Sequence, residues 1–388
     1  MKNKKWMAIL LGGIMAASLA APCSVSAAEK TTLTFWHAMG GTNGEVLQQI
    51  VDDFNASQDE IEVKAEYQGT YDDTITKLKA AMQSDSGLPD VCQMYDVGTK
   101  FMYDSGAVIP VEDKFESTGY DKSSVMEVIS SYYTVDGKQY AMPFNVSTPM
   151  LYYNKDVFEA ETPPTTYDEV LEDAKKIVDS GAAPVGYSQA IYGWFFEQQL
   201  AGLGVTYGNN DNGRKEAVTA VDFDSNGGGL KVFDMWKKLY DSGYFEDYGT
   251  TTADTQTAFF SGQVGMIIES TAILKNAVDS SPFEVGTGYL PRIEQNDEGG
   301  VIIGGGSLWL TDTGNEANED AAWKFIEYIT TPDVQAKWSM GTGYFAINEK
   351  AYETEDMKAY LKENPNFETA INQLKDSPVN CNTAGVLS

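Results

Sequence analysis

Residues 31–95 alternate between strand-like and helix-like patterns, and this alternation limits the fold more than any other feature. Polar and apolar residues alternate over 31–36 (TTLTFW), as in a half-buried strand. A helical face then carries Val46, Leu47, Ile50, Val51 and Phe54. The pattern continues with a strand at 62–67, a helix at 71–82 and a buried strand at 89–95. Strands separated by helices predict an α/β fold with a mostly parallel sheet.

A second group of elements follows residue 130. Asp136-Gly137 between 131–135 and 138–142 predicts a hairpin. Thr166 and Glu169 form a capping box before a helix. One further helix is predicted from Val232, Phe233, Trp236, Leu239 and Tyr240, and another from Ala322, Phe325, Ile326 and Ile329. Thr331-Pro332 predicts the start of the next helix. Strands are expected at 264–268 and 301–310. The 388 residues, without repeats or long linkers, predict two α/β lobes joined by short segments.

The N-terminus has the features of an export signal. Three lysines precede an apolar run at 7–21, and Val25-Ser26-Ala27 fits a cleavage site, so residues 1–27 are predicted to be a signal peptide. The alternative is a lipoprotein box ending at Cys23, although Pro22 departs from that pattern. No later segment reaches the roughly 20 apolar residues of a membrane span. We therefore expect export to the periplasm or cell surface, with or without a lipid anchor through Cys23.

Charge and histidine content exclude several functions. The chain has 27 basic and 57 acidic residues, a net charge of −30, which disfavours nucleic acid and anionic lipid as partners. His37 is the only histidine. Residues 186–190 (GYSQA) come close to a nucleophile elbow, but no histidine follows them. We expect no catalytic residue, metal or cofactor, and a packed or capping role for His37.

Other motifs have structural explanations. Residues 222–227 (DFDSNG) open like a calcium loop, but its twelfth position is Phe233, so a turn and helix cap are expected. Residues 304–306 (GGG) predict a close backbone approach to a ligand or another strand. Cys92 is expected to be a buried apolar residue, and a disulfide with Cys381 is an alternative in an oxidising compartment.

Several aromatic residues fall in predicted loops, where they can pack against the C–H faces of polyols and sugars. They are Tyr71, Tyr95, Tyr192, Trp194 and Tyr344. Composition alone favours a core position for any one of them.

Seven motifs, taken together, resemble a known family. They are 35–37 (FWH), 67–71 (YQGTY), 94–99 (MYDVGT), 143–149 (PFNVSTP), 151–155 (LYYNK), 302–309 (IIGGGSLW) and 342–344 (TGY). The chain resembles the extracellular solute-binding proteins of ABC importers, in the branch that binds sn-glycerol 3-phosphate. The resemblance extends over almost all of the chain after the signal peptide.

The resemblance implies a two-lobed periplasmic-binding-protein fold that closes by a hinge on a ligand between the lobes. One lobe would comprise 28–143 and 303–345, and the other 147–300 and 346–388. The implied ligand contacts are Tyr71, Asp96, Ser147, Ser270, Gly305 and Tyr344. Asp96 stands where the family usually has glutamate. The implied partners are a small polar solute and the transmembrane subunits of an ABC permease.

One departure concerns the ligand. The family has a phosphate-binding arginine near its C-terminus, where this chain has Val386, and a guanidinium is a main source of phosphate selectivity. Glu269 adds a carboxyl beside Ser270. A glycerophosphodiester, a neutral sugar or a polyol is therefore expected to bind better than glycerol 3-phosphate, unless Lys100 or Lys155 holds the phosphate. The resemblance also implies a further helical segment beyond residue 388. An exported carbohydrate-active enzyme is the remote alternative.

Overall fold

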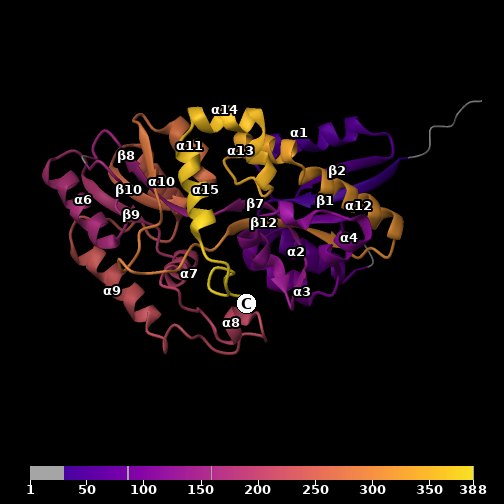
Figure 1. Ribbon diagram of the computed structural model, residues 1–388, viewed down its shortest axis with the longest axis horizontal. Helices are drawn as coiled ribbons and strands as arrows, with labels where there is room; N and C mark the ends of the chain where they lie inside the picture. Colours follow the sequence, from indigo (N-terminus) through magenta and orange to yellow (C-terminus); the bar gives the residue numbers. More distant parts are fainter. Residues whose placement is uncertain (1–29, 85–86, 159, 388) are drawn as a thin grey trace, which may run out of the picture.

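The computed structural model describes residues 30–84, 87–158 and 160–387. The predicted signal peptide at 1–27 and Cys23 lie outside these residues. Two sheets lie side by side, each covered by helices (Figure 1). Within the described ranges, no helix is both long enough and apolar enough to cross a membrane.

The first sheet contains the predicted parallel unit. Strands β1 (Thr31–His37), β2 (Ile61–Tyr67), β3 (Val91–Tyr95), β12 (Gly304–Thr311) and β4 (Val108–Ile109) follow the order β2-β1-β3-β12-β4, and β7 (Met142–Ser147) also pairs with β12. β1 is parallel to both β2 and β3. The helices α1 (Gly41–Ser57) and α2 (Tyr71–Met82) connect these strands. The predicted β-α-β-α-β order is confirmed.

The second sheet has four strands in the order β11-β8-β10-β9. They are β8 (Pro149–Asn154), β9 (Val185–Gln189), β10 (Val264–Ser270) and β11 (Val285–Gly288). The helices α6 (Tyr167–Asp179), α7 (Gly193–Gly202), α9 (Gly228–Asp241) and α10 (Thr252–Phe260) belong to this part of the chain. Only Thr148 separates β7 of the first sheet from β8 of the second.

The remaining helices complete both halves. They are α3 (Thr99–Asp104), α4 (Val111–Thr118), α5 (Glu127–Ser130), α8 (Asn209–Gly213), α11 (Leu274–Ser280), α12 (Glu316–Ile329), α13 (Pro332–Thr342), α14 (Glu355–Glu363) and α15 (Asn366–Asp376). The short 3₁₀ helices are η1 (Asp96–Gly98), η2 (Lys122–Ser124), η3 (Ser131–Tyr133), η4 (Thr271–Ile273) and η5 (Glu349–Glu353). α13 packs on α1 and η5, whereas α15 packs on β11.

Buried glutamine side chains hold the segments that run between the sheets. Gln373 of α15 donates to the carbonyl of Pro149 at 2.7 Å and accepts the N–H of Leu290 at 2.5 Å. Gln198 of α7 bonds both the N–H and the carbonyl of Ile302, each at 2.8 Å. In both places, a glutamine side chain makes hydrogen bonds to the backbone that a neighbouring strand would otherwise make.

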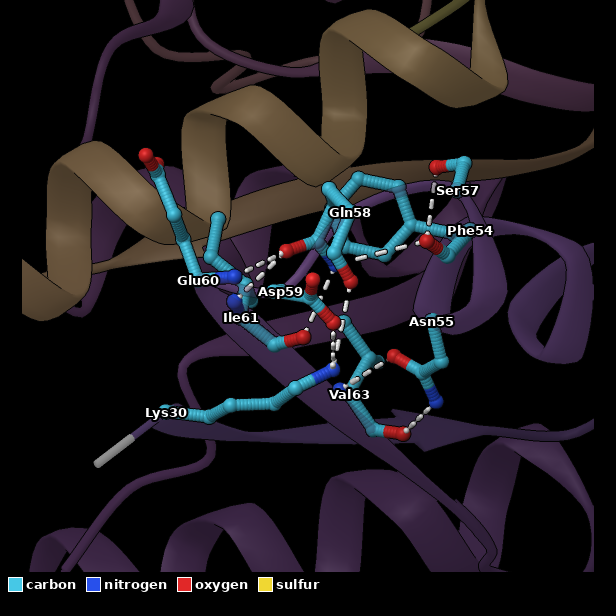
Figure 2. Close-up of polar contacts among 9 residues, drawn as sticks. All are labelled: Lys30, Phe54, Asn55, Ser57, Gln58, Asp59, Glu60, Ile61 and Val63. Carbon is cyan, nitrogen blue, oxygen red and sulfur yellow. Dashed lines mark hydrogen bonds and ion pairs between the residues drawn. The ribbon is translucent and has the colours of Figure 1, made fainter. Parts of the chain in front are cut away.

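Side-chain amides also organise the turn from α1 to β2 (Figure 2). The Gln58 side chain accepts the N–H groups of Glu60 and Ile61, both at 2.7 Å. Asn55 bonds the N–H and the carbonyl of Val63 at 2.8 and 2.9 Å. Because β2 is an edge strand, the Asn55 amide satisfies backbone groups that would otherwise be open to pairing.

Local signals were reliable where a side chain acts on its own backbone. The Thr166 capping box is present, with Thr166 accepting the N–H of Glu169 at 3.2 Å. The N–H groups of Ser225 and Asn226 both bond the carbonyl of Asp222, which confirms the predicted turn. The predicted side-chain cap is wrong, because the N-cap of α9 is Gly227 and Asn226 instead accepts the N–H of Gly228. His37 is buried and accepts the Met39 N–H at Nδ1, as expected of a packed residue. Its burial lowers the pKa of His37 to about 4.

Other expectations are corrected. Ser131–Tyr133 is a 3₁₀ helix, so the hairpin around Asp136-Gly137 is reduced to β5 (Thr134–Val135) and β6 (Lys138–Gln139). β12 begins only at Gly304 because the backbone of Ile302 bonds Gln198. Phe233 and Tyr240 are 54% and 69% exposed, and Val232, Met235 and Leu239 form the buried face of α9 instead. Both Cys92 and Cys381 are free thiols, so the disulfide does not form.

Candidate ligand site

The glycine run at the start of β12 lies directly against β7. Gly305 has φ +98°, and a Cβ there would lie 1.8 Å from the carbonyl oxygen of Asn145. Of the two alternatives for this run, the structure shows close approach to another strand. Ser147, which is 4% exposed, pairs with Gly304 in the same ladder. Two predicted ligand residues, Ser147 and Gly305, therefore lie on adjacent strands.

Asn145 connects these strands to the predicted tyrosines. Its Nδ2 donates to the hydroxyl of Tyr71 at 2.9 Å, and its Oδ1 accepts from Gln93 at 2.7 Å. A hydrogen bond with Asn145 also lowers the pKa of Tyr344, although burial raises it overall. The Tyr71 ring stacks on Tyr95 with centroids 5.0 Å apart. Asn145 was not among the predicted site residues.

Asp96 lies beside this group, directly after β3. Its negative charge contributes to the raised pKa of both Tyr71 and Tyr344, for which burial is the main cause. Burial raises the pKa of Asp96 itself to about 7, and the charge of Glu197 adds to that rise. Among the described residues Asp96 forms no ion pair. Tyr71 and Tyr344 thus both bond Asn145, and the charge of Asp96 acts on both tyrosines.

Ser270 ends β10 in the second sheet, where it pairs with Pro149, and no contact joins it to Tyr71, Asp96 or Tyr344 among the described residues. Its Oγ accepts the N–H of Ala272 at 3.2 Å and caps η4. The neighbouring Glu269 is 3% exposed and accepts from the Ser270 N–H at 2.7 Å and from Gln256 at 2.9 Å. Burial chiefly raises the pKa of Tyr192, and the charges of Glu269 and Asp96 both add to the rise. Tyr192 is therefore affected by a carboxyl group from each half of the molecule, that of Asp96 after β3 and that of Glu269 in β10.

Trp194 adds an unused hydrogen-bond donor. Its Nε1 is buried, and no acceptor for it is found in the part of the chain described. A Cβ on Gly304 would lie 3.2 Å from this nitrogen, so the indole packs against the start of β12. A buried donor without an acceptor costs free energy unless another molecule supplies the oxygen.

Two further charged residues, Glu197 and Arg214, were not among the residues predicted from the sequence. Glu197 of α7 accepts the N–H of Val386 at 2.6 Å, and burial raises the pKa of Glu197 to about 7. Arg214 donates to the carbonyls of Tyr132 at 2.7 Å and Gly385 at 3.1 Å, and also bonds Ala384. The available signal for Glu197 was an acidic residue directly after three aromatic residues at 194–196 (WFF).

The two lysines considered as alternative phosphate partners are both paired with carboxylates. Lys100 bonds Asp104, and Lys155 bonds Glu284 at 2.6 Å. The sequence has two arginines, Arg214 and Arg292. The terminal nitrogens of Arg214 are already used by backbone carbonyls. Across the described ranges, no group of three or more His, Cys, Asp or Glu is arranged to hold a metal ion.

Comparison with known proteins decides the family. The family of bacterial extracellular solute-binding proteins matches residues 49–369. The chain belongs to this family. The protein is accordingly the solute-binding component of an ABC importer, and its family consists of binding proteins rather than enzymes.

Relatives of this solute-binding protein agree over most of its length. It is 32% identical to the sn-glycerol-3-phosphate-binding periplasmic protein UgpB of Agrobacterium fabrum, over 92% of this chain and 83% of the relative. Identity to UgpB of Escherichia coli is 30%, over 90% and 81%. The crystal structure of UgpB from Mycobacterium tuberculosis with glycerophosphocholine has a TM-score of 0.78 at 22% identity, covering 90% and 87%. The two-lobed periplasmic-binding-protein fold is thereby confirmed.

A separate cavity of about 520 Å³ lies in the second half of this solute-binding protein. α7, the segment after β11 and α15 enclose it, with Pro163, Leu290, Arg292 and Gln373 among its walls. None of the six predicted ligand residues lines this cavity.

Proposed function

We propose that this protein captures a small polyhydroxylated solute at Tyr71, Asp96, Ser147, Ser270, Gly305 and Tyr344, and delivers it to the transmembrane subunits of an ABC permease. The observation that carries the proposal is that Tyr71 and Tyr344 both bond Asn145, which lies in the β7–β12 ladder, while the charge of Asp96 acts on both tyrosines. A carboxyl and neutral donors beside aromatic rings suit hydroxyl groups and C–H faces. Relatives at 30–32% identity are named as glycerol-phosphate-binding proteins, which supports a glycerol-containing solute.

The cleft is proposed to lie between two lobes with the predicted boundaries. One lobe comprises 28–143 and 303–345, and the other 147–300 and 346–388. The division is supported by the strands, because β1 to β7 and β12 share one sheet or its neighbouring hairpin, and β8 to β11 share the other. The C-terminal part touches both halves, since Asn348 pairs with Val125 while α15 packs on β11.

Charge favours a neutral or zwitterionic solute over glycerol 3-phosphate. Val386 occupies the position of the family's arginine and offers only its backbone N–H, which Glu197 already accepts. The charge of Glu197 acts on Asp96, the charges of Asp96 and Glu269 both act on Tyr192, and the terminal nitrogens of Arg214 donate to backbone carbonyls. A glycerophosphodiester is therefore the proposed solute class, with a sugar as the second candidate.

Calorimetry tests this proposal with glycerol 3-phosphate, glycerophosphocholine and a set of neutral sugars. A hydrogen bond to a charged group contributes about 1.5–3 kcal/mol, which corresponds to roughly ten- to a hundredfold in affinity. We expect glycerol 3-phosphate to bind at least about tenfold more weakly than the preferred ligand. Submicromolar binding of glycerol 3-phosphate, with no response to the other compounds, would contradict the proposed ligand class.

The protein is further proposed to be exported through the signal at 1–27. The family is extracellular, and the named relatives are periplasmic. Cleavage after Ala27 gives a free protein, whereas acylation of Cys23 gives an anchored one. The mass of the exported protein distinguishes these two forms.

A further inference from the structure

The cavity bounded by α7, the segment after β11 and α15 has the size of a small-molecule site. Its volume is about 520 Å³, within the range of roughly 300–1,000 Å³ that such sites occupy. Leu290 and Val301, which are 9% and 3% exposed, form apolar parts of its wall, and Pro163 and Pro291 line it as well. The cavity therefore presents a preformed apolar surface to a ligand.

Two buried polar side chains in the wall of this cavity are already paired. Gln373, which is 4% exposed, bonds the carbonyl of Pro149 and the N–H of Leu290. Ser377 accepts the N–H of Val301 at 3.1 Å and donates to the carbonyl of Gln373 at 2.9 Å. These bonds fix the shape of the cavity. Selectivity for a charged ligand must therefore come from the charged residues that line it.

Of the described residues that line the cavity, two are charged, and their charges are opposite. Arg292 belongs to the segment after β11, and Asp376 ends α15. Both residues are exposed, so they lie where the cavity opens to solvent. The hydroxyl of Tyr289, another lining residue that is 38% exposed, donates to the Asp376 carboxylate at 2.8 Å. An arginine from one segment and a carboxylate beside an aromatic ring from another thus border the same cavity.

Neither charge is paired in the part of the chain that the structure describes. Arg292 and Asp376 form no ion pair with each other or with another described residue, and the Arg292 guanidinium donates no hydrogen bond to one. The acids close to Arg292 in sequence have other partners: Glu294 pairs with Lys231 at 3.0 Å, and the Asp297 carboxylate accepts the N–H of Glu294 at 2.8 Å. Both charges are therefore available to a ligand.

We propose that this cavity is a second binding site, separate from the six predicted ligand contacts, for a small zwitterion with an apolar body. The anionic group bonds the Arg292 guanidinium, which suits an oxyanion such as a carboxylate or phosphate. The cationic group lies against the Tyr289 ring and the Asp376 carboxylate, which together suit an ammonium. The apolar body covers Leu290 and Val301. The cavity is independent of the proposed function, since none of the six predicted ligand residues lines it.

A zwitterion fits this cavity better than an ion of one sign. An anion would pair with Arg292 but would be repelled by Asp376, and a cation would pair with Asp376 but would be repelled by Arg292. A neutral molecule would displace water from both charged groups without replacing the hydrogen bonds of that water. Only a ligand with both charges gains both contacts.

Three probes separate these contacts. The sulfobetaine benzyldimethylammonio-propanesulfonate has both charges and an apolar ring, whereas benzyltrimethylammonium has only the cation and phenylpropanesulfonate only the anion. None of them has the hydroxyl groups that the proposed ligand site is expected to hold. Calorimetry at low ionic strength measures each affinity. We expect the sulfobetaine to bind at one site, about three- to fivefold more tightly than either single ion, which is the scale of one partly exposed charge pair.

Two substitutions assign the contacts to residues. Arg292→Gln should weaken binding of the sulfobetaine and the sulfonate by about three- to fivefold, without weakening the ammonium. Asp376→Asn should weaken the sulfobetaine and the ammonium to the same extent and spare the sulfonate. Thermal melting checks that both variants fold. Glu368→Gln is the matched control for Asp376→Asn, because it removes a negative charge from an exposed position on the same helix outside the cavity, and it should change no affinity.

Two results would overturn the second site. One is the absence of saturable sulfobetaine binding, and the other is equal sulfobetaine affinity in the wild type and in both variants. Asp96→Asn alters the proposed ligand site and should leave sulfobetaine binding unchanged. Loss of binding in that variant would place the probe at the ligand site and would also overturn the inference. Failure of every glycerol-containing solute to bind the wild type would instead overturn the proposed function alone.

Discussion

At the scale of single residues, Gly305 has the most demanding position in the molecule. It combines a left-handed backbone with φ +98° and a space in which a Cβ would meet the Asn145 carbonyl oxygen at 1.8 Å. A side chain there would have to push β12 away from β7. Because Asn145 also bonds Tyr71, this movement would disturb the proposed ligand site as well as the sheet.

We expect Gly305→Ala to lower the free energy of unfolding by about 2–4 kcal/mol, from combined backbone strain and overpacking. Gly314→Ala is the control, because Gly314 also has a positive φ but no atom lies within 4 Å of a Cβ there. It should cost only about 1 kcal/mol. Urea denaturation of both variants measures the difference. Equal losses would show that the contact with Asn145 is not limiting.

Residue-level patterns located only part of the site. Tyr71, Asp96 and Tyr344 lie in family motifs, and in the structure both tyrosines bond Asn145. Arg214 carries no such signal, because its role depends on carbonyls at Ala384 and Gly385, about 170 positions along the chain. Such a contact exists only after the two segments have packed, so neither spacing nor periodicity could reveal it.

At the scale of elements, helix ends were the most predictable feature. The residues 71–82 predicted as a helix are the bounds of α2, which begins with a capping box between Thr70 and Asp73. These contacts are local, so the sequence contains all of their partners. The buried face of α9 was predicted wrongly because the apolar residues of this helix are spread over more than the one side that packs against the core. Phe233 contacts Phe196 with ring centroids 5.3 Å apart and yet remains 54% exposed.

A comparison of two helix starts tests the value of capping. Thr166→Ala removes the oxygen that accepts the Glu169 N–H at the start of α6, and should cost about 1 kcal/mol of unfolding free energy. Thr251 precedes α10 but makes no side-chain capping bond. Thr251→Ala should therefore change stability by less than about 0.5 kcal/mol. Chemical denaturation of the two variants decides the point, and a larger loss from Thr251→Ala would refute the explanation.

At the scale of the whole molecule, the two described cysteines lie in different environments. Cys92 is fully buried in β3, and burial raises the pKa of its thiol. Cys381 is half-buried in the C-terminal segment. Burial raises the pKa of the Cys381 thiol too, so the expected difference in reactivity rests on access, because reagents reach a half-buried thiol and not a fully buried one.

We expect one thiol, that of Cys381, to react with a disulfide reagent in the folded protein cleaved after Ala27. The second thiol should react only after unfolding. A reducing agent should leave the melting temperature unchanged, because no Cys92–Cys381 bond exists to be broken. Cys381→Ser provides the control and should abolish the rapid reaction. Loss of melting temperature on reduction would indicate a disulfide in solution.

The bond between Gln198 and Ile302 has a mechanical consequence. Ile302 is fastened to α7 through both of its backbone groups, and α7 shares the core of the second sheet. Gly304 already belongs to β12 in the first sheet. In this connection, the backbone torsion of any rotation between the two sheets therefore falls on Ile303, so the connection would bend at a single residue.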